Sequence, residues 1–304
     1  MRLGLLTALT MVAFAANSIL NRLALEGGGT GPASFAAIRL AAGAAMLAAL
    51  VALRGGRPAW RAGLGGPAAL ALYVLGFSFA YVSLPAGIGA LILFGGVQVT
   101  MFAGAVLTRE PVPARRWLGA ALSFAGLAYL MWPAGTAAPD LTGTVLMAAA
   151  ALGWGLYSLI GRGAGDPLAA TAANFLWAMP AGLALWLIAP DGLDRGGALL
   201  AAISGAVTSG IGYAMWYRVL PGLGAARAAV AQLTVPVIAI AGGTLMLGEA
   251  LSLRVVLASA LVLGGVAWSV MPGRAVRIDR QEAGLSAPRG GTGHGKRGAV
   301  ERLR

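Results

Sequence analysis

The sequence predicts an all-α polytopic membrane protein with ten transmembrane helices in two inverted five-helix repeats and both termini in the cytoplasm. Three observations support this prediction. The chain of 304 residues is 59% hydrophobic and only 11% charged, with a mean hydropathy of +0.81. It divides into ten apolar segments, most of them long enough to cross a bilayer. Patterns of the first half also recur in the second half at a nearly constant spacing.

The composition excludes several classes of protein. A soluble domain carries roughly 25% charged residues, so this chain is too apolar to be one. The sequence contains no cysteine, which excludes disulfides, thiol chemistry and thiolate metal sites. The net charge of +12 is a weak indication of nucleic-acid binding, because eight of the 22 basic residues lie in the last 31 positions.

The spans follow from the lengths of the apolar segments. A helix needs roughly 20 apolar residues to cross the hydrocarbon core. The connections are short, and several, such as 27–32 and 109–113, contain the Gly and Pro residues that mark helix ends. The predicted spans are 3–21, 32–53, 65–84, 87–107, 117–133, 141–160, 168–189, 198–217, 228–247 and 255–271.

The first span has an alternative interpretation as a secretory signal peptide. Arg2 precedes an apolar run, and Ala13-Phe14-Ala15 imitates a small-residue cleavage site. Its counterpart in the second half, 141–160, lies too far along the chain to be a signal. We therefore expect a transmembrane helix.

The internal repeat is clearest around two Leu-Pro motifs. Tyr, Leu, Pro, Gly and Ala recur in the same order in 81–90 and 217–226, and further on Glu110 corresponds to Glu249. So many ordered matches indicate a duplicated unit. The predicted domains are a first repeat at 1–136, a second at 137–272 and a basic, disordered tail at 273–304.

The distribution of Arg and Lys predicts the orientation. Segments predicted to face the cytoplasm hold 18 of these residues and the opposite segments hold three, as the positive-inside rule requires. Five spans per repeat is an odd number, so the second repeat would be inserted upside down relative to the first. Inverted repeats are typical of transporters that hold their substrate near the middle of the membrane.

The spans lack the groups that catalysis needs. All ten carboxylates fall in connections, at span ends or in the tail, and the single histidine, His294, lies in the tail. Neither an acid–base pair nor a proton relay is available at membrane depth. The sequence therefore predicts no enzyme, no cofactor, no metal site, and transport without proton coupling.

The candidate binding residues are mid-span amides and aromatic rings, several of them at positions paired by the repeat. Rings supply an apolar wall, and amides can orient a neutral or zwitterionic solute through hydrogen bonds. The alternative is ordinary packing between helices. The predicted substrate-binding residues are Asn17, Phe77, Tyr81, Gln98, Trp154, Tyr213, Tyr217 and Gln232.

Three further features of the spans have their own expectations. Arg39 is the one full charge placed well into a span, and it is either a structural clamp or a contact for a substrate carboxylate. Trp132 and Trp268 lie toward span ends, where tryptophan anchors helices at the membrane interface. Pro236 lies inside the ninth span and is expected to kink it.

Several segments resemble the EamA branch of the drug/metabolite transporter superfamily. They are Pro236-Val237-Ile238 through Leu247-Gly248-Glu249-Ala250, Leu107-Thr108-Arg109-Glu110 and Ala37-Ile38-Arg39-Leu40. The resemblance extends over 1–272 and implies the ten-helix fold.

Among members of the family, the chain is similar to YddG-type exporters of aromatic amino acids. This similarity implies an exporter of aromatic and other apolar amino acids in the bacterial inner membrane. The inverted repeats predict that it works by alternating access, and we expect a monomer. Its expected partners are the solute and the lipid bilayer, without nucleic acid. The alternatives are export of another metabolite (a nucleotide sugar, phosphate ester or drug) and a non-transporting membrane scaffold.

Overall fold

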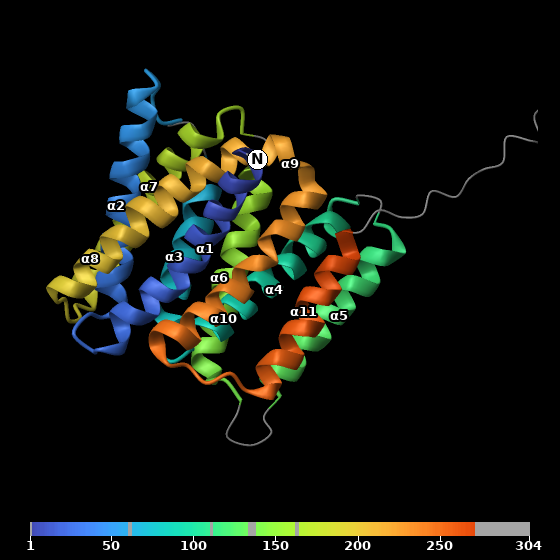
Figure 1. Ribbon diagram of the computed structural model, residues 1–304. Helices are drawn as coiled ribbons and strands as arrows, with labels where there is room; N and C mark the ends of the chain where they lie inside the picture. Colours follow the sequence, from blue (N-terminus) through green and yellow to red (C-terminus); the bar gives the residue numbers. More distant parts are fainter. Residues whose placement is uncertain (1, 60–62, 110–111, 133–137, 162–163, 271–304) are drawn as a thin grey trace, which may run out of the picture. The chain divides into compact units, whose positions relative to one another are not determined.

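A computed structural model describes residues 2–59, 63–109, 112–132, 138–161 and 164–270. These residues form helices and no β-strand (Figure 1). Met1–Met271 form one compact unit; the second unit, Pro272–Arg304, contains the predicted tail and lies outside the described residues. The helices are α1 (Arg2–Glu26), α2 (Pro32–Leu53), α3 (Gly65–Ala80), α4 (Ala86–Leu107), α5 (Ala114–Met131), α6 (Leu141–Gly161), α7 (Pro167–Ile188), α8 (Arg195–Ile203), the π-helix η2 (Ser204–Ile211), α9 (Gly212–Gln232), α10 (Thr234–Leu247) and α11 (Leu253–Val270).

Most of the helices occupy the predicted spans. Six helices in the described part of the chain are long and apolar enough to cross a membrane, and three shorter apolar helices accompany them. One of the six combines α8, η2 and the start of α9 in Arg195–Val219. α5 occupies the fifth predicted span and carries Arg115 and Arg116 in its first turn. The protein is a multi-pass membrane protein.

The predicted connection between the eighth and ninth spans is wrong in position. The predicted connection lies at 218–227, whereas α9 continues through this stretch and the interruption follows at Leu233. Pro236 supplies the physical reason. Proline has no N–H for the carbonyl four residues earlier, which belongs to Gln232, and its ring crowds that carbonyl. The proline that was predicted to kink the span divides it into two helices.

Alternate connections meet at one end of the helices. The α1–α2 connection contacts the α7–α8 connection, where the N–H of Gly31 donates to the carbonyl of Gly192 at 2.7 Å. The α3–α4 connection contacts the start of α6, where the Ser83 hydroxyl donates to Asp140 at 2.8 Å. We call this end the outer end, because the charge distribution predicts that it faces away from the cytoplasm.

The connections α2–α3 and α6–α7 meet at the opposite, inner end. Arg54 pairs there with Asp166, with 3.1 Å between nitrogen and oxygen. Asp166 caps α7 by accepting from the N–H of Leu168 and of Ala169. The Ala169 N–H and Arg54 lower the pKa of Asp166 below its ordinary value of 3.8. Both side chains of the pair are about half exposed, so the pair is screened by water and weak.

Helices that the repeat pairs make equivalent contacts. α3 packs along α6, and the segment from α8 to α9 packs along α1. The repeat pairs α1 with α6 and α3 with this segment, so each packing arrangement is the counterpart of the other. α2 packs against α7, and α5 packs against α11, each a helix beside its own counterpart. The domain boundaries 1–136 and 137–272 stay a prediction.

α5 and α11 lie side by side (Figure 1) and approach closely at two glycines. A Cβ atom added to Gly265 would lie 2.6 Å from the carbonyl oxygen of Gly119 and 2.6 Å from the hydroxyl of Ser123. The Ser123 hydroxyl donates to the carbonyl of Val262 at 3.1 Å. Small residues allow such contact between membrane helices, and this crossing requires glycine.

Candidate functional site

A small cavity lies between five helices, α1, α3, α4, α6 and α9. Its volume is about 20 Å³, which is room for a water molecule. Most lining residues lie near the middle of their helices, as expected for a transporter site. They are Phe14, Asn17, Tyr73, Phe77, Leu93, Phe94, Trp154 and Tyr213.

Aromatic rings form a continuous cluster around this cavity. The ring of Trp154 lies 4.9 Å from that of Tyr73 and 5.2 Å from that of Tyr213, measured between centroids. Phe14 lies 5.8 Å from Tyr213, and Phe77 lies 5.4 Å from Tyr73. Tilted and edge-on ring pairs each contribute about 0.5–1.5 kcal/mol beyond the area that they bury. The wall is therefore apolar and built from helices of both predicted repeats.

Asn17 is the amide in the cavity lining, and two hydroxyls determine its orientation. Ser204 donates to Asn17 Oδ1 at 2.8 Å, and Thr208 donates to the same oxygen. Both hydroxyls come from the π-helix η2, a conformation that often occurs at functional sites. Since the amide oxygen already accepts two hydrogen bonds, the amide nitrogen is the group available to donate to a solute.

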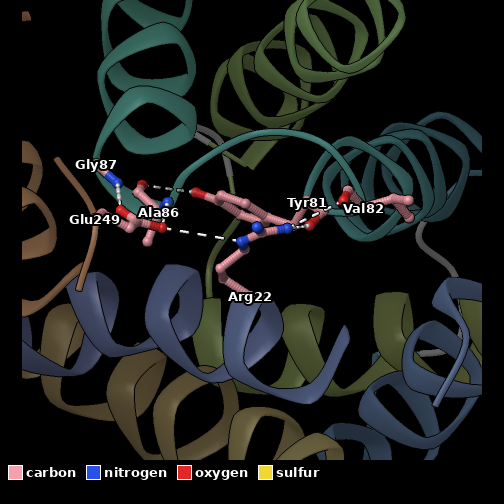
Figure 2. A network of polar contacts seen from close by, with 6 residues as sticks. All are labelled: Arg22, Tyr81, Val82, Ala86, Gly87 and Glu249. Carbon is pink, nitrogen blue, oxygen red and sulfur yellow. Dashed lines mark hydrogen bonds and ion pairs between the residues drawn. The ribbon is translucent and has the colours of Figure 1, made fainter. Parts of the chain in front are cut away.

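Figure 2 shows a polar network at the outer end that connects α1, the α3–α4 connection and the stretch after α10. Glu249 accepts a hydrogen bond from the N–H of Ala86, the first residue of α4, at 2.6 Å. Arg22 donates to the carbonyls of Tyr81 at 3.1 Å and Val82 at 3.0 Å. Its Nε atom lies 3.9 Å from the Glu249 carboxylate. The network therefore joins the two predicted repeats at this end.

A second junction at the outer end joins α2 to the α7–α8 connection. The Asp191 carboxylate accepts from the N–H of Ala33 at 2.7 Å and from the N–H and hydroxyl of Ser34 at 2.9 and 2.6 Å. It caps α2, whose own N-cap residue, Gly31, makes no side-chain hydrogen bond. A carboxylate at this position satisfies free N–H groups and interacts favourably with the helix dipole.

The structure brings together half of the predicted binding residues. Tyr81 is fully buried beside the outer-end network, and its hydroxyl donates to the carbonyl of Ala86 at 3.3 Å. The hydroxyl of Tyr217 accepts from Thr171 at 3.0 Å. Gln98 on α4 and Gln232 at the end of α9 are half-buried, and neither belongs to the cavity lining. The predicted residues that line the cavity are Asn17, Phe77, Trp154 and Tyr213.

Tyr73 lines the cavity but is not among the predicted binding residues. It stands one helical turn before Phe77, so the spacing of four residues places both rings on the same face of α3. Phe14, Leu93 and Phe94 complete the lining. Helical spacing around an already selected aromatic residue is the signal that identifies Tyr73.

The described carboxylates lie at helix ends. Asp140, Asp166 and Asp194 cap α6, α7 and α8, and Glu249 follows α10. Among the residues with described positions, no group of three or more His, Cys, Asp or Glu could hold a metal ion. His294 lies outside the described residues.

Comparisons with known proteins agree with the helical membrane fold. Residues 141–271 match the EamA-like transporter family. An uncharacterized protein of Pseudomonas aeruginosa is 50% identical over 280 residues, which cover 90% of this chain and 96% of that protein. An uncharacterized transporter of Archaeoglobus fulgidus is 26% identical over 251 residues, or 77% of this chain and 87% of that protein.

A solved crystal structure of another protein shares the fold. The two chains are 18% identical, and they superpose with a TM-score of 0.64 over 88% of this chain and 97% of the other. The strong similarity to the Pseudomonas protein extends over nearly the whole chain, and the family match covers most of the second predicted repeat. The chain therefore belongs to the EamA-like transporter family of the drug/metabolite transporter superfamily and is a membrane transporter.

Proposed function

We propose that this protein exports amino acids with aromatic and other apolar side chains across a bacterial inner membrane. The observation that carries the proposal is the cavity between five helices, with its aromatic wall and the amide of Asn17. Burial of an apolar side chain against such a wall contributes about 25 cal/mol per Å². The Asn17 amide nitrogen can donate to a carboxylate oxygen of the solute. Membership in the family supports transport but does not identify the substrate, which is inferred from the cavity.

Alternating access follows from the size of the cavity. A volume of about 20 Å³ is far below the roughly 300–1,000 Å³ of ordinary ligand pockets. An amino acid enters only if the helices move apart. At the outer end, Glu249 and Asp191 bind backbone N–H groups of the other predicted repeat. At the inner end the Arg54–Asp166 pair is half exposed, so we propose that the solute enters from the inner end.

The proposed transport runs down the gradient of the solute itself, by a monomer with no other partner than solute and lipid. Coupling to protons requires a group at membrane depth that gains and loses a proton. The described carboxylates instead cap helices at the two ends. Arg39 lies deeper, but a guanidinium offers hydrogen-bond donors and no acceptor.

Liposomes that contain only the purified protein test this proposal. We expect labelled phenylalanine, tryptophan and leucine to enter these liposomes faster than protein-free liposomes, with no imposed pH or sodium gradient. Uptake of only a phosphate ester, a nucleotide sugar or a drug would replace the substrate class. A strict requirement for an ion gradient would overturn the uncoupled mechanism. Absence of flux for every solute would favour a scaffold.

A further inference from the structure

Arg39 on α2 is a fully buried charge beside the cavity wall. Its Nη2 atom donates to the hydroxyl of Tyr73 at 2.9 Å, and its Nε atom donates to Ser209 at 3.4 Å. The guanidinium carbon lies 4.8 Å from the ring centroid of Phe77 and 5.2 Å from that of Tyr73. Nη1 is buried and has no hydrogen-bond partner.

This charge has no counter-ion among the described residues. Arg22 and Arg54 each pair with a carboxylate, but no described carboxylate forms an ion pair with Arg39. Hydroxyl dipoles and aromatic faces compensate a buried cation only in part. An unpaired ionisable group inside a membrane protein generally marks a site for a solute or ion.

We propose that Arg39 binds the carboxylate of the transported solute. The inference rests on the proposed function and specifies the group by which the amino acid is held. A carboxylate supplies the missing negative charge and can accept from both terminal nitrogens of a guanidinium. One of these nitrogens, Nη1, already lacks a partner.

The rings of Tyr73 and Phe77 separate Arg39 from the cavity. Both rings line the cavity, and both lie against the guanidinium. A displacement of the Phe77 ring would bring the cavity into contact with the charge. We therefore place the carboxylate of the solute toward α2, and its side chain against the ring of Trp154.

The repeat leaves this charge without an equivalent. The spacing that pairs Pro32 with Pro167 also pairs Arg39 with Asn174. Asn174 is buried and neutral. Only one side of the pseudo-symmetric site therefore attracts an anion, which gives a bound amino acid a single preferred orientation.

The decisive experiment compares solutes with and without the carboxylate. Equilibrium dialysis measures binding of labelled phenylalanine, phenylalanine amide and 3-phenylpropionate to the purified protein in detergent. Phenylalanine and 3-phenylpropionate carry a carboxylate, and phenylalanine amide does not. For the wild type we expect the two carboxylates to bind about tenfold or more tightly than the amide, because hydrogen bonds to charged groups are strong. For Arg39→Gln we expect this preference to disappear while amide binding persists.

A purely structural role of Arg39 predicts a different result. Arg39→Gln would then weaken the binding of carboxylates and amide in the same proportion, which would overturn the inference. Equal affinity of the wild type for all three solutes would overturn it as well. If Arg39→Gln does not fold, Tyr73→Phe replaces it, since that variant frees Nη2 and keeps the ring. We expect Tyr73→Phe to change carboxylate affinity selectively, and an equal change for the amide would contradict the proposal.

Flux into liposomes separates this inference from the proposed function. Transport of amino acids together with equal binding of carboxylate and amide would leave the exporter standing and refute the role of Arg39. Carboxylate binding that depends on Arg39, without flux of any solute, would refute the exporter and leave the anion site standing.

Discussion

The Nε atom of Arg22 lies 3.9 Å from the carboxylate of Glu249, and each side chain also holds backbone groups of the α3–α4 connection. Arg22 binds two carbonyls at the end of α3, and Glu249 binds the first N–H of α4 (Figure 2). The pair thus links both ends of the α3–α4 connection to α1 and to the stretch after α10. Separation of the repeats at the outer end requires these contacts to break.

Glu249→Gln should make the outer end open more often. The amide keeps one acceptor for Ala86 but removes the charge that attracts Arg22 and the helix dipole. A loss of about 1 kcal/mol in capping corresponds to about a fivefold change in the open population. The chain has no cysteine, so a single Cys at the fully buried Ala90 reports opening through its rate of labelling by an external maleimide.

Arg54→Gln provides the matched control for this labelling experiment. It removes the ion pair of the inner end and should not increase labelling of the Cys at position 90 from outside. Similar increases in both variants would mean that the network around Glu249 has no particular role in closing the outer end.

Trp154→Leu should reduce flux of aromatic amino acids by about tenfold, because the ring contacts that form the wall are lost. Trp154 lines the cavity, whereas Trp268 is 50% exposed on the outside of α11. Trp268→Leu should therefore leave the flux unchanged. Initial uptake rates of labelled phenylalanine, at equal amounts of inserted protein, check both variants. Equal losses would show that the cavity wall does not contact the solute.

Gly265→Ala should lower the melting temperature in detergent, and Gly264→Ala should not. A Cβ at position 265 meets the carbonyl of Gly119, whereas a Cβ at position 264 meets nothing within 4 Å. Overpacking of this kind costs about 1–3 kcal/mol. Thermal unfolding followed by size-exclusion chromatography measures the difference. Equal stability of the two variants would contradict the close crossing of α5 and α11.

Asp140 should stabilise the fold at neutral pH and lose this effect in acid. The N–H of Gly143 and then the hydroxyl of Ser83 lower the pKa of Asp140 below its ordinary 3.8. A lowered pKa in the folded state means that the stabilisation is fully present above 3.8 and disappears as the pH falls through the lower value. The difference in melting temperature between wild type and Asp140→Asn should be constant from neutral to mildly acidic pH and shrink below pH 3.8. A difference that grows in acid would contradict this assignment.

Helix bounds were predictable because they depend on local properties of the chain. The length of each apolar run and the Pro or Gly at its ends define most of the helices. The predicted connection at 218–227 contains the second Leu-Pro motif, whose counterpart lies at the α3–α4 connection. That earlier connection is held by Arg22 and Glu249, which lie far away in the sequence. A Leu-Pro motif alone does not contain these contacts. The two halves also differ at the proline that interrupts the ninth span, because Pro236 has Val97 as its counterpart in the first half.

The cavity could be predicted only in part, because pairing by the repeat identifies only some of its lining residues. Phe77 and Tyr213 are such a pair, and both line the cavity. Tyr73 pairs with Ser209, so symmetry gave no reason to select an aromatic residue there. Gln98 was selected for its mid-span position, which does not determine the face of the helix on which a side chain lies.

The capping of α2 and α4 has a consequence for biosynthesis. Their first N–H groups bind Asp191 and Glu249, which the ribosome adds only after both helices have been made. During synthesis, water at the membrane surface must serve as the acceptor for these groups. The outer end can therefore reach its final form only after Glu249 has been inserted. A nascent chain that stops before Asp191 would keep the starts of both helices hydrated and without their carboxylate caps.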